Sequence, residues 1–113
     1  MIPIPEPIKI KSDVSALKQR LDWGEPALTI IDARSREAFN NNHITGAISF
    51  PVGELVNRAL MNLELIRDIY VYGGNEKETA TAANKLRDAG YENVAELVGG
   101  FESWKAAGYP VEG

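Results

Sequence analysis

Short apolar runs recur along the chain, and segments whose apolar residues recur at helical spacing lie between them. Ala27–Ile31 is apolar at all but one position, which is typical of a strand covered on both faces of a sheet. The runs predict core strands at Ala27–Ile31, Ala47–Phe50, Ile69–Tyr72 and Val94–Leu97.

Helices are predicted between these strands from apolar spacing and from residues that cap or stop a helix. The first begins at Ser12 or Asp13 and ends before Gly24 and Pro26. The others are predicted at Ser35–Asn42, at Glu54–Arg67, either continuous or broken near Asn62, at Glu76–Ala89 before a left-handed Gly90, and between the turn Gly99–Gly100 and the stop at Gly108 and Pro110.

The N-terminus is rich in proline, which restricts it to extended conformations. We interpret residues 1–7 as an arm and Ile8–Ile10 as an edge strand of one domain that spans residues 8–113. Strands that alternate with helices indicate parallel βαβ units. We therefore predict a three-layer α/β fold with a central, mostly parallel sheet of four or five strands and helices on both faces.

Composition and charge exclude several classes of partner and location for this chain. The chain has 113 residues and a formal net charge of −4 at pH 7, and its basic residues are scattered. This charge argues against nucleic acid and membrane surfaces as partners. The longest apolar run, Ala27–Ile31, is far short of the ~20 residues that span a bilayer. The N-terminus lacks the features of a secretory signal, so we expect a cytoplasmic location.

Ligands of parallel α/β sheets bind beyond the carboxyl ends of the strands, where loops lead to helix N-termini. The turns "DARSRE" and "YGGNEKET" follow the first and third core strands. The second turn favours binding, because glycines free the backbone and the next helix presents unpaired N–H groups. However, the chain contains no cysteine, which excludes a thiol nucleophile, a disulfide and a thiolate metal site.

Two motifs resemble a known family, the rhodanese-like domain. "IIDARSREAFNNNHITGAISFP" is similar to the first signature of that family, through Asp32, Arg34, Glu37, Phe39, His43, Ile44, Gly46, Ala47 and Pro51. "AGYENVAELVGGFESWKAAGYPV" is similar to its closing segment, through Gly90, Tyr91, Val94, Leu97, Gly99, Gly100, Trp104, Gly108 and Pro110. The likeness extends from about Ile8 to Val111 and implies the rhodanese-like fold.

The resemblance also implies a sulfurtransferase loop. In active members a cysteine follows the strand, backbone amides surround it, and an arginine opens the next helix; the thiolate takes up sulfane sulfur as a persulfide. In this chain Gly73 stands at the cysteine position and Glu78 at the arginine position. Glycine has no nucleophile. Glu76 and Glu78 would repel an anionic substrate, at about 3 to 4 kcal/mol for each contact of ~4 to 6 Å.

We therefore predict a degenerate active-site loop without a catalytic residue. The loop comprises Gly73, Gly74, Asn75, Glu76, Lys77, Glu78 and Thr79. Its two glycines are interpreted as a tight turn that needs positive φ and, compatibly with that, as a small vacant pocket lined by amides that accepts a carboxylate, a carbonyl or a water. Glu76 and Glu78 either complement the helix dipole, which contributes about 0.3 to 1 kcal/mol each, or converge with Asp32 on a divalent cation.

The remaining signature residues have structural roles in the family, as the resemblance implies. Asp32 ties down a loop, Arg34 bridges neighbouring segments, and His43 hydrogen-bonds the turn that enters the next strand; Glu37 and Gly46 complete this set. Separately, the helical spacing of Phe101 and Trp104 predicts core residues, whereas Trp23 and Tyr109 lie beside turns and are candidates for exposed contacts.

The predicted function is that of a catalytically degenerate rhodanese-like domain, a non-enzymatic module for protein interaction or regulation. Its contact surface is the loop Gly73–Thr79. One alternative is an enzyme that uses the family scaffold for other, metal-assisted chemistry, and another is a docking domain of a larger protein. We expect no cofactor, no bound metal, an unidentified protein as partner, and a monomer.

Overall fold

The computed structural model of the chain describes residues 10–24 and 27–113. The predicted arm, residues 1–7, therefore lies outside the described residues, as do Ile8 and Lys9 of the predicted edge strand and Pro26. The described edge strand is β1 (Lys11–Ser12), and Ile10 directly precedes it.

The centre of the molecule is a sheet of five parallel strands in the order β1-β6-β5-β2-β4, which confirms the predicted α/β architecture. The other strands are β2 (Leu28–Asp32), β4 (Ile48–Ser49), β5 (Asp68–Tyr72) and β6 (Val94–Leu97). The central pair, β2 and β5, runs in register from Leu28 beside Asp68 to Asp32 beside Tyr72. Both strands therefore end at the same level, and the loops that follow them begin side by side.

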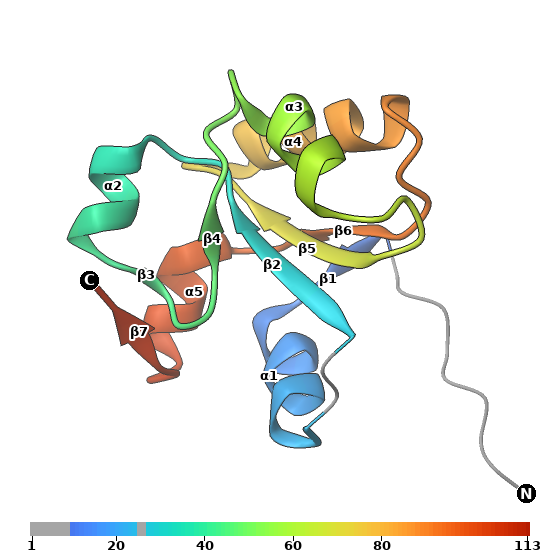
Figure 1. The fold of residues 1–113 in the computed structure, drawn as a ribbon. Helices are drawn as coiled ribbons and strands as arrows, with labels where there is room; N and C mark the ends of the chain where they lie inside the picture. The colour runs from blue at the N-terminus through green and yellow to red at the C-terminus, as the bar shows by residue number, and fades with distance from the viewer. Residues whose placement is uncertain (1–9, 25–26) are drawn as a thin grey trace, which may run out of the picture.

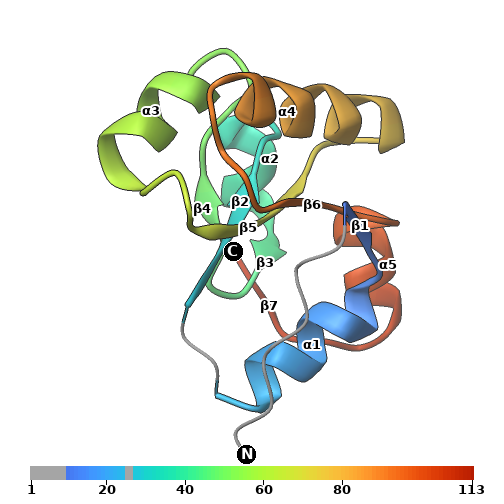
Figure 2. The ribbon, with the colours of Figure 1, turned by 90° about the vertical axis from the view of Figure 1, so that its right-hand side faces the viewer.

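Helices cover both faces of this sheet, as predicted (Figures 1 and 2). The helices are α1 (Val14–Asp22), α2 (Arg36–Asn41), α3 (Leu55–Asn62), α4 (Glu76–Asp88) and α5 (Gly100–Ala106). α3 and α4 lie on one face, and α1 and α5 lie on the other. Asp13, Ser35 and Asn75 cap α1, α2 and α4, because each side chain accepts a hydrogen bond from a first-turn N–H group.

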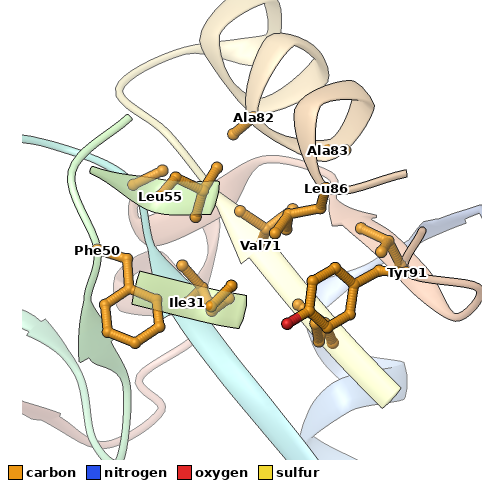
Figure 3. Close-up of a cluster of buried hydrophobic side chains, with 12 residues drawn as sticks. Ile31, Phe50, Leu55, Val71, Ala82, Ala83, Leu86 and Tyr91 are labelled. Carbon is orange, nitrogen blue, oxygen red and sulfur yellow. The ribbon is translucent and has the colours of Figure 1, made fainter. Parts of the chain in front are cut away.

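Each face of the sheet buries its own apolar cluster. Figure 3 shows the cluster under α3 and α4, which includes Ile31 and Val71 from the central strands and Leu55 and Leu86 from the helices. The cluster on the other face includes Phe101 and Trp104, which are 5% and 1% exposed, so the core positions predicted for them are confirmed. Trp23 is 78% exposed, whereas Tyr109 is half-buried with its ring 5.0 Å from that of Trp104.

Of the two alternatives for the helix predicted at Glu54–Arg67, the break near Asn62 is confirmed and the continuous helix is wrong. α3 ends at Asn62, and Leu63 is extended with φ −126° and ψ 138°. The segment that follows offers its carbonyl groups to donors near β6, because Tyr91 Oη donates to the Leu63 carbonyl and Glu92 N donates to the Leu65 carbonyl. These long-range hydrogen bonds replace the ones that a continued helix would make.

A small antiparallel pair of strands was not predicted. β3 (His43–Ile44) pairs with β7 (Val111–Glu112) in a separate sheet that joins the middle of the chain to its C-terminal end. Both strands have only two residues, so neither has a periodicity that a sequence pattern can reveal. Among the described residues, none of the helices is both long and apolar enough to cross a membrane.

Candidate functional site

Three loops meet at the carboxyl end of the sheet. The β2–α2 loop joins the end of β5 through the hydrogen bond from Ala33 N to the Tyr72 carbonyl, which is 2.8 Å long. The β6–α5 loop joins the start of α4 through the 2.8 Å hydrogen bond from Gly99 N to Glu76 Oε1. The predicted loop Gly73–Thr79 lies between these contacts.

Several amides of this loop, including those of Gly73 and Gly74, are already hydrogen-bonded to the chain itself. Gly73 N donates to Thr79 Oγ1, and Gly74 N donates to Glu78 Oε2, both at 2.8 Å. Asn75 Oδ1 accepts from Glu78 N at 2.8 Å, and the Asn75 carbonyl accepts from Thr79 Oγ1 at 2.9 Å. A small hollow does lie beside these positions, but side chains of α4 already satisfy the Gly73 and Gly74 N–H groups that the predicted pocket would offer to a ligand.

The reason for glycine at position 73 also differs from the prediction. Neither Gly73 nor Gly74 has positive φ, whereas Gly99 and Gly100 of the adjacent loop do, with φ of 79° and 52°. A Cβ atom on Gly73 would lie 2.9 Å from Glu78 Cβ and 3.0 Å from Thr79 N. Position 73 is glycine because the first turn of α4 packs directly against it, and a cysteine there would collide with that turn.

The three carboxylates proposed as a cation site point to different partners. Glu76 accepts from Gly99 N, Glu78 accepts from Gly74 N, and Asp32 is fully buried in contact with Arg34. Over residues 10–24 and 27–113, no group of three or more His, Asp and Glu side chains is arranged to hold a metal ion. The metal-assisted alternative therefore has no convergent ligand set in the described residues.

Asp32 and Arg34 form a compact ion pair under the loop. Arg34 Nη2 lies 2.7 Å from Asp32 Oδ2, Arg34 Nε is 3.1 Å from both carboxylate oxygens, and Arg34 Nη2 also donates to the Asn42 carbonyl at 2.7 Å. Burial opposes the charge of Arg34, but the hydrogen bonds and the charge of Asp32 raise the pKa of the guanidinium above its usual value. Arg34 is therefore engaged by Asp32 and does not replace the missing arginine.

Tyr72 lies below this ion pair and directly precedes Gly73. Its side chain is fully buried, and its hydroxyl oxygen accepts a 3.2 Å hydrogen bond from Ile44 N. The Arg34 guanidinium carbon is 5.4 Å from the centre of the Tyr72 ring. Burial, followed by the negative charge of Asp32, raises the pKa of the Tyr72 phenol well above its usual value. Tyr72 therefore stays neutral and connects the loop to β3.

His43 belongs to another part of the structure. Its Nδ1 atom lies 2.7 Å from the Phe39 carbonyl oxygen, and its ring stacks on the Phe39 ring with centroids 3.6 Å apart. Its Nε2 atom lies 3.3 Å from Glu112 Oε1, which also accepts from Gly46 N. Glu37 is exposed in the first turn of α2. His43, Glu37 and Gly46 do not line the hollows beside the loop.

Two hollows border the loop and share Arg34 and Asn75 in their walls. The larger, about 440 Å³, is lined by Ala33, Arg34, Ser35, Val52, Asn75, Lys77, Glu78 and Thr81. The smaller, about 60 Å³, is lined by Arg34, Gly73, Gly74, Asn75, Glu76, Thr79, Gly99, Gly100, Phe101 and Glu102. The predicted site did not include Val52 or Glu102. The sequence signal for this part of the site was the glycine turn Gly99–Gly100 of the closing motif, which lines the smaller hollow.

Comparisons with known proteins agree with these features. The family model described as "Rhodanese-like domain" matches residues 13–107. The HTH-type transcriptional regulator Rv0324 of Mycobacterium tuberculosis is 39% identical over 98 residues, which cover 85% of this chain and 42% of the regulator. The thiosulfate sulfurtransferase GlpE of Pseudomonas putida is 35% identical over 86 residues, which cover 74% of each chain. The chain thus spans less than half the length of the regulator.

A solved structure has the same architecture. The crystal structure of the Alr3790 protein from Anabaena sp. superposes with a TM-score of 0.89 at 54% sequence identity. The match covers 90% of this chain and 91% of that chain.

Proposed function

Because the chain belongs to the rhodanese-like domain family and contains no cysteine, we propose that it is a non-catalytic member that acts in protein interaction or regulation. The observation that carries this proposal is the closed loop at position 73. Gly73 stands where the family resemblance places the nucleophile, and Glu78 packs against it. The chain is homologous to sulfurtransferases, but the residue that would hold the sulfur is absent.

The electrostatics of the loop support the same conclusion. A sulfur-transfer loop has to attract an anion, and thiosulfate would meet the carboxylates of Glu76 and Glu78 here. The Gly74 N–H that a cradle would offer to such an anion donates to Glu78 instead. Arg34, which also lines both hollows, is neutralised by its ion pair with Asp32. An anionic substrate would therefore have to displace an internal carboxylate, and among the described residues that line the hollows only Lys77 is a cation without an ion-pair partner.

The regulatory part of the proposal draws support from a relative. Rv0324, an HTH-type transcriptional regulator, includes a region similar to this chain, which spans 42% of its length. A domain of this family can thus be one part of a longer regulatory protein. We assign the same kind of role to this chain, as a docking module whose contact surface is the loop Gly73–Thr79 and whose location is the cytoplasm.

A thiosulfate:cyanide assay tests the non-catalytic assignment. The chain is incubated with thiosulfate and cyanide, and thiocyanate is measured against a reaction without protein. GlpE of Pseudomonas putida serves as the positive control. We expect thiocyanate from this chain to equal the protein-free background, because no thiolate can form a persulfide. Thiocyanate production that scales with the concentration of this chain would overturn the proposal.

A further inference from the structure

The surface around the closed loop combines an apolar hollow with an excess of negative charge. We call it the loop surface and define it by Val52, Lys77 and the carboxylates of Glu76, Glu78 and Glu102. Arg34 and Asn75 line both hollows, so the two hollows are neighbours.

The negative charges of this surface have no cationic partners among the described residues. Glu76 and Glu78 are bonded to the backbone N–H groups of Gly99 and Gly74, which are neutral donors. Across residues 10–24 and 27–113, no ion pair involves Glu76, Glu78 or Glu102. Of the neighbouring cations, Arg34 is paired with Asp32, which leaves Lys77 to oppose three carboxylates.

An apolar contact point lies beside these charges. Val52 lines the larger hollow and is 43% exposed, and the small side chain of Ala33 lines the same wall. The hollow of about 440 Å³ has room for a side chain of leucine size. An occupant that matches both features has an apolar side chain for the hollow and positive charge for the adjacent carboxylates.

We propose that the loop surface binds a segment of a partner protein that carries an apolar side chain next to lysine or arginine. This inference rests on the proposed function, because it names the chemistry of the partner for the same loop. The replacement of a catalytic arginine by Glu78 then has a second effect. It excludes anions from the loop, and it contributes to the negative charge that selects a basic partner.

Peptide titrations of the ¹⁵N-labelled chain test this inference. The probe is acetyl-Ala-Leu-Arg-Lys-Ala-amide, and the matched probe is acetyl-Ala-Leu-Glu-Gln-Ala-amide. We expect the basic peptide to shift the amide resonances of Gly74, Lys77 and Gly99, and the acidic peptide to leave them unchanged. The dissociation constant of the basic peptide, obtained from these shifts, should rise about tenfold or more when salt is raised from about 0.05 to about 0.5 M, because salt screens exposed charges.

Charge-neutral variants provide the matched controls. The triple variant Glu76→Gln, Glu78→Gln, Glu102→Gln keeps side-chain oxygens that accept the Gly74 and Gly99 N–H bonds but removes the charges. We expect it to bind the basic peptide about tenfold more weakly. The control variant Glu64→Gln, Glu92→Gln removes exposed charges from the loops that precede β5 and β6, at the opposite end of the parallel strands. We expect its dissociation constant to change less than about twofold, because these charges are distant.

Four results would overturn the inference. They are no binding of the basic peptide, equal shifts with the acidic peptide, shifts confined to residues outside the loop surface, and an unchanged affinity of the triple variant. Failure here is distinguishable from failure of the proposed function. Thiocyanate production overturns the non-catalytic assignment itself, whereas a null thiocyanate assay without binding of the basic peptide rejects only the partner chemistry.

Discussion

At the residue scale, Gly73 and Glu78 depend on each other. The main chain and Cβ of Glu78 occupy the space that a side chain at position 73 would need, and the Glu78 carboxylate binds the next amide, Gly74 N. Restoring a cysteine alone at position 73 would therefore not restore a sulfurtransferase loop. The first turn of α4 would also have to move away.

We predict that Gly73→Ala destabilises the chain. The added Cβ would lie 2.9 Å from Glu78 Cβ and 3.0 Å from the backbone atoms Glu78 C and Thr79 N, so the helix start has to shift. We expect the free energy of unfolding, measured by urea denaturation, to fall by about 1 to 3 kcal/mol. The control is Gly53→Ala, because a Cβ there meets nothing within 4 Å. Equal stability of the two variants would contradict close packing at position 73.

Tyr72 gives a prediction about pH. Its pKa is raised in the folded chain, so its contribution to stability is complete below the pKa of an unfolded tyrosine, about 10, and is lost as pH rises above that value. We expect the free energy of unfolding to fall more steeply between about pH 9.5 and about pH 11.5 in the original chain than in Tyr72→Phe. Urea denaturation across this range measures both slopes. Lysines titrate in both proteins, so parallel slopes would contradict the raised pKa.

At the element scale, the start of α4 holds two loops in place. Asn75 caps the helix, Thr79 and Glu78 bind the amides of the β5–α4 loop, and Glu76 binds the amide of Gly99. One helical turn thus supplies the acceptors for both the Gly73–Thr79 segment and the β6–α5 loop. The acidic first turn also matches the positive end of the helix dipole.

We predict that Thr79→Val lowers the free energy of unfolding, because it removes the hydrogen bonds that join the β5–α4 loop to the first turn of α4. Thr79 is 2% exposed, and its hydroxyl accepts from Gly73 N and donates to the Asn75 carbonyl. Valine keeps the shape but leaves the buried Gly73 N–H unpaired, which costs about 1 to 3 kcal/mol. The matched control is Thr81→Val, because the Thr81 hydroxyl is exposed and donates to the Lys77 carbonyl on the helix surface. Urea denaturation of both variants provides the comparison, and a larger loss for Thr81→Val would refute the role of Thr79.

At the scale of the whole molecule, the loops that follow the parallel strands lie at one end of the sheet. Elsewhere, a strip of exposed apolar side chains lies on α3 and on the segment that follows it. The exposed apolar residues there are Leu60, Met61, Leu65 and Ile66. A few side chains supply much less than the ~800 Å² that each partner buries in a standard interface. This strip is within the range of ordinary monomer surfaces.

We therefore predict that the chain is a monomer in solution. Sedimentation equilibrium at several concentrations should give the mass of one chain throughout. The variant Met61→Gln, which removes an 83% exposed apolar side chain from the strip, should give the same mass. A mass of two chains that Met61→Gln reduces to one would show that the strip is a dimer interface.

The sequence predictions were correct where the signal lies within a few neighbouring residues, and they were incomplete where the structure depends on contacts between distant parts of the chain. The core strand Val94–Leu97 was predicted with its observed bounds, because its apolar residues are close neighbours in the chain and no distant partner is needed to recognise them. The end of α3 was predicted only as one of two alternatives, a break near Asn62, since the donors near β6 that take the carbonyls after Asn62 are distant in the chain. The β3–β7 pair was missed for a related reason, because its hydrogen bonds join residues far apart in the chain.

The sequence by itself determined that no thiol can act here, because folding cannot supply a nucleophile that the chain lacks. It also placed Gly73 at the carboxyl end of a core strand and Glu78 in the first turn of the helix that follows. Only the tertiary structure decided that a side chain at position 73 would collide with the start of α4. It also decided that the carboxylates of Glu78 and Glu76 accept hydrogen bonds from Gly74 N and Gly99 N. These facts depend on ångström-scale distances, which are set by how α4 packs against the strand before it.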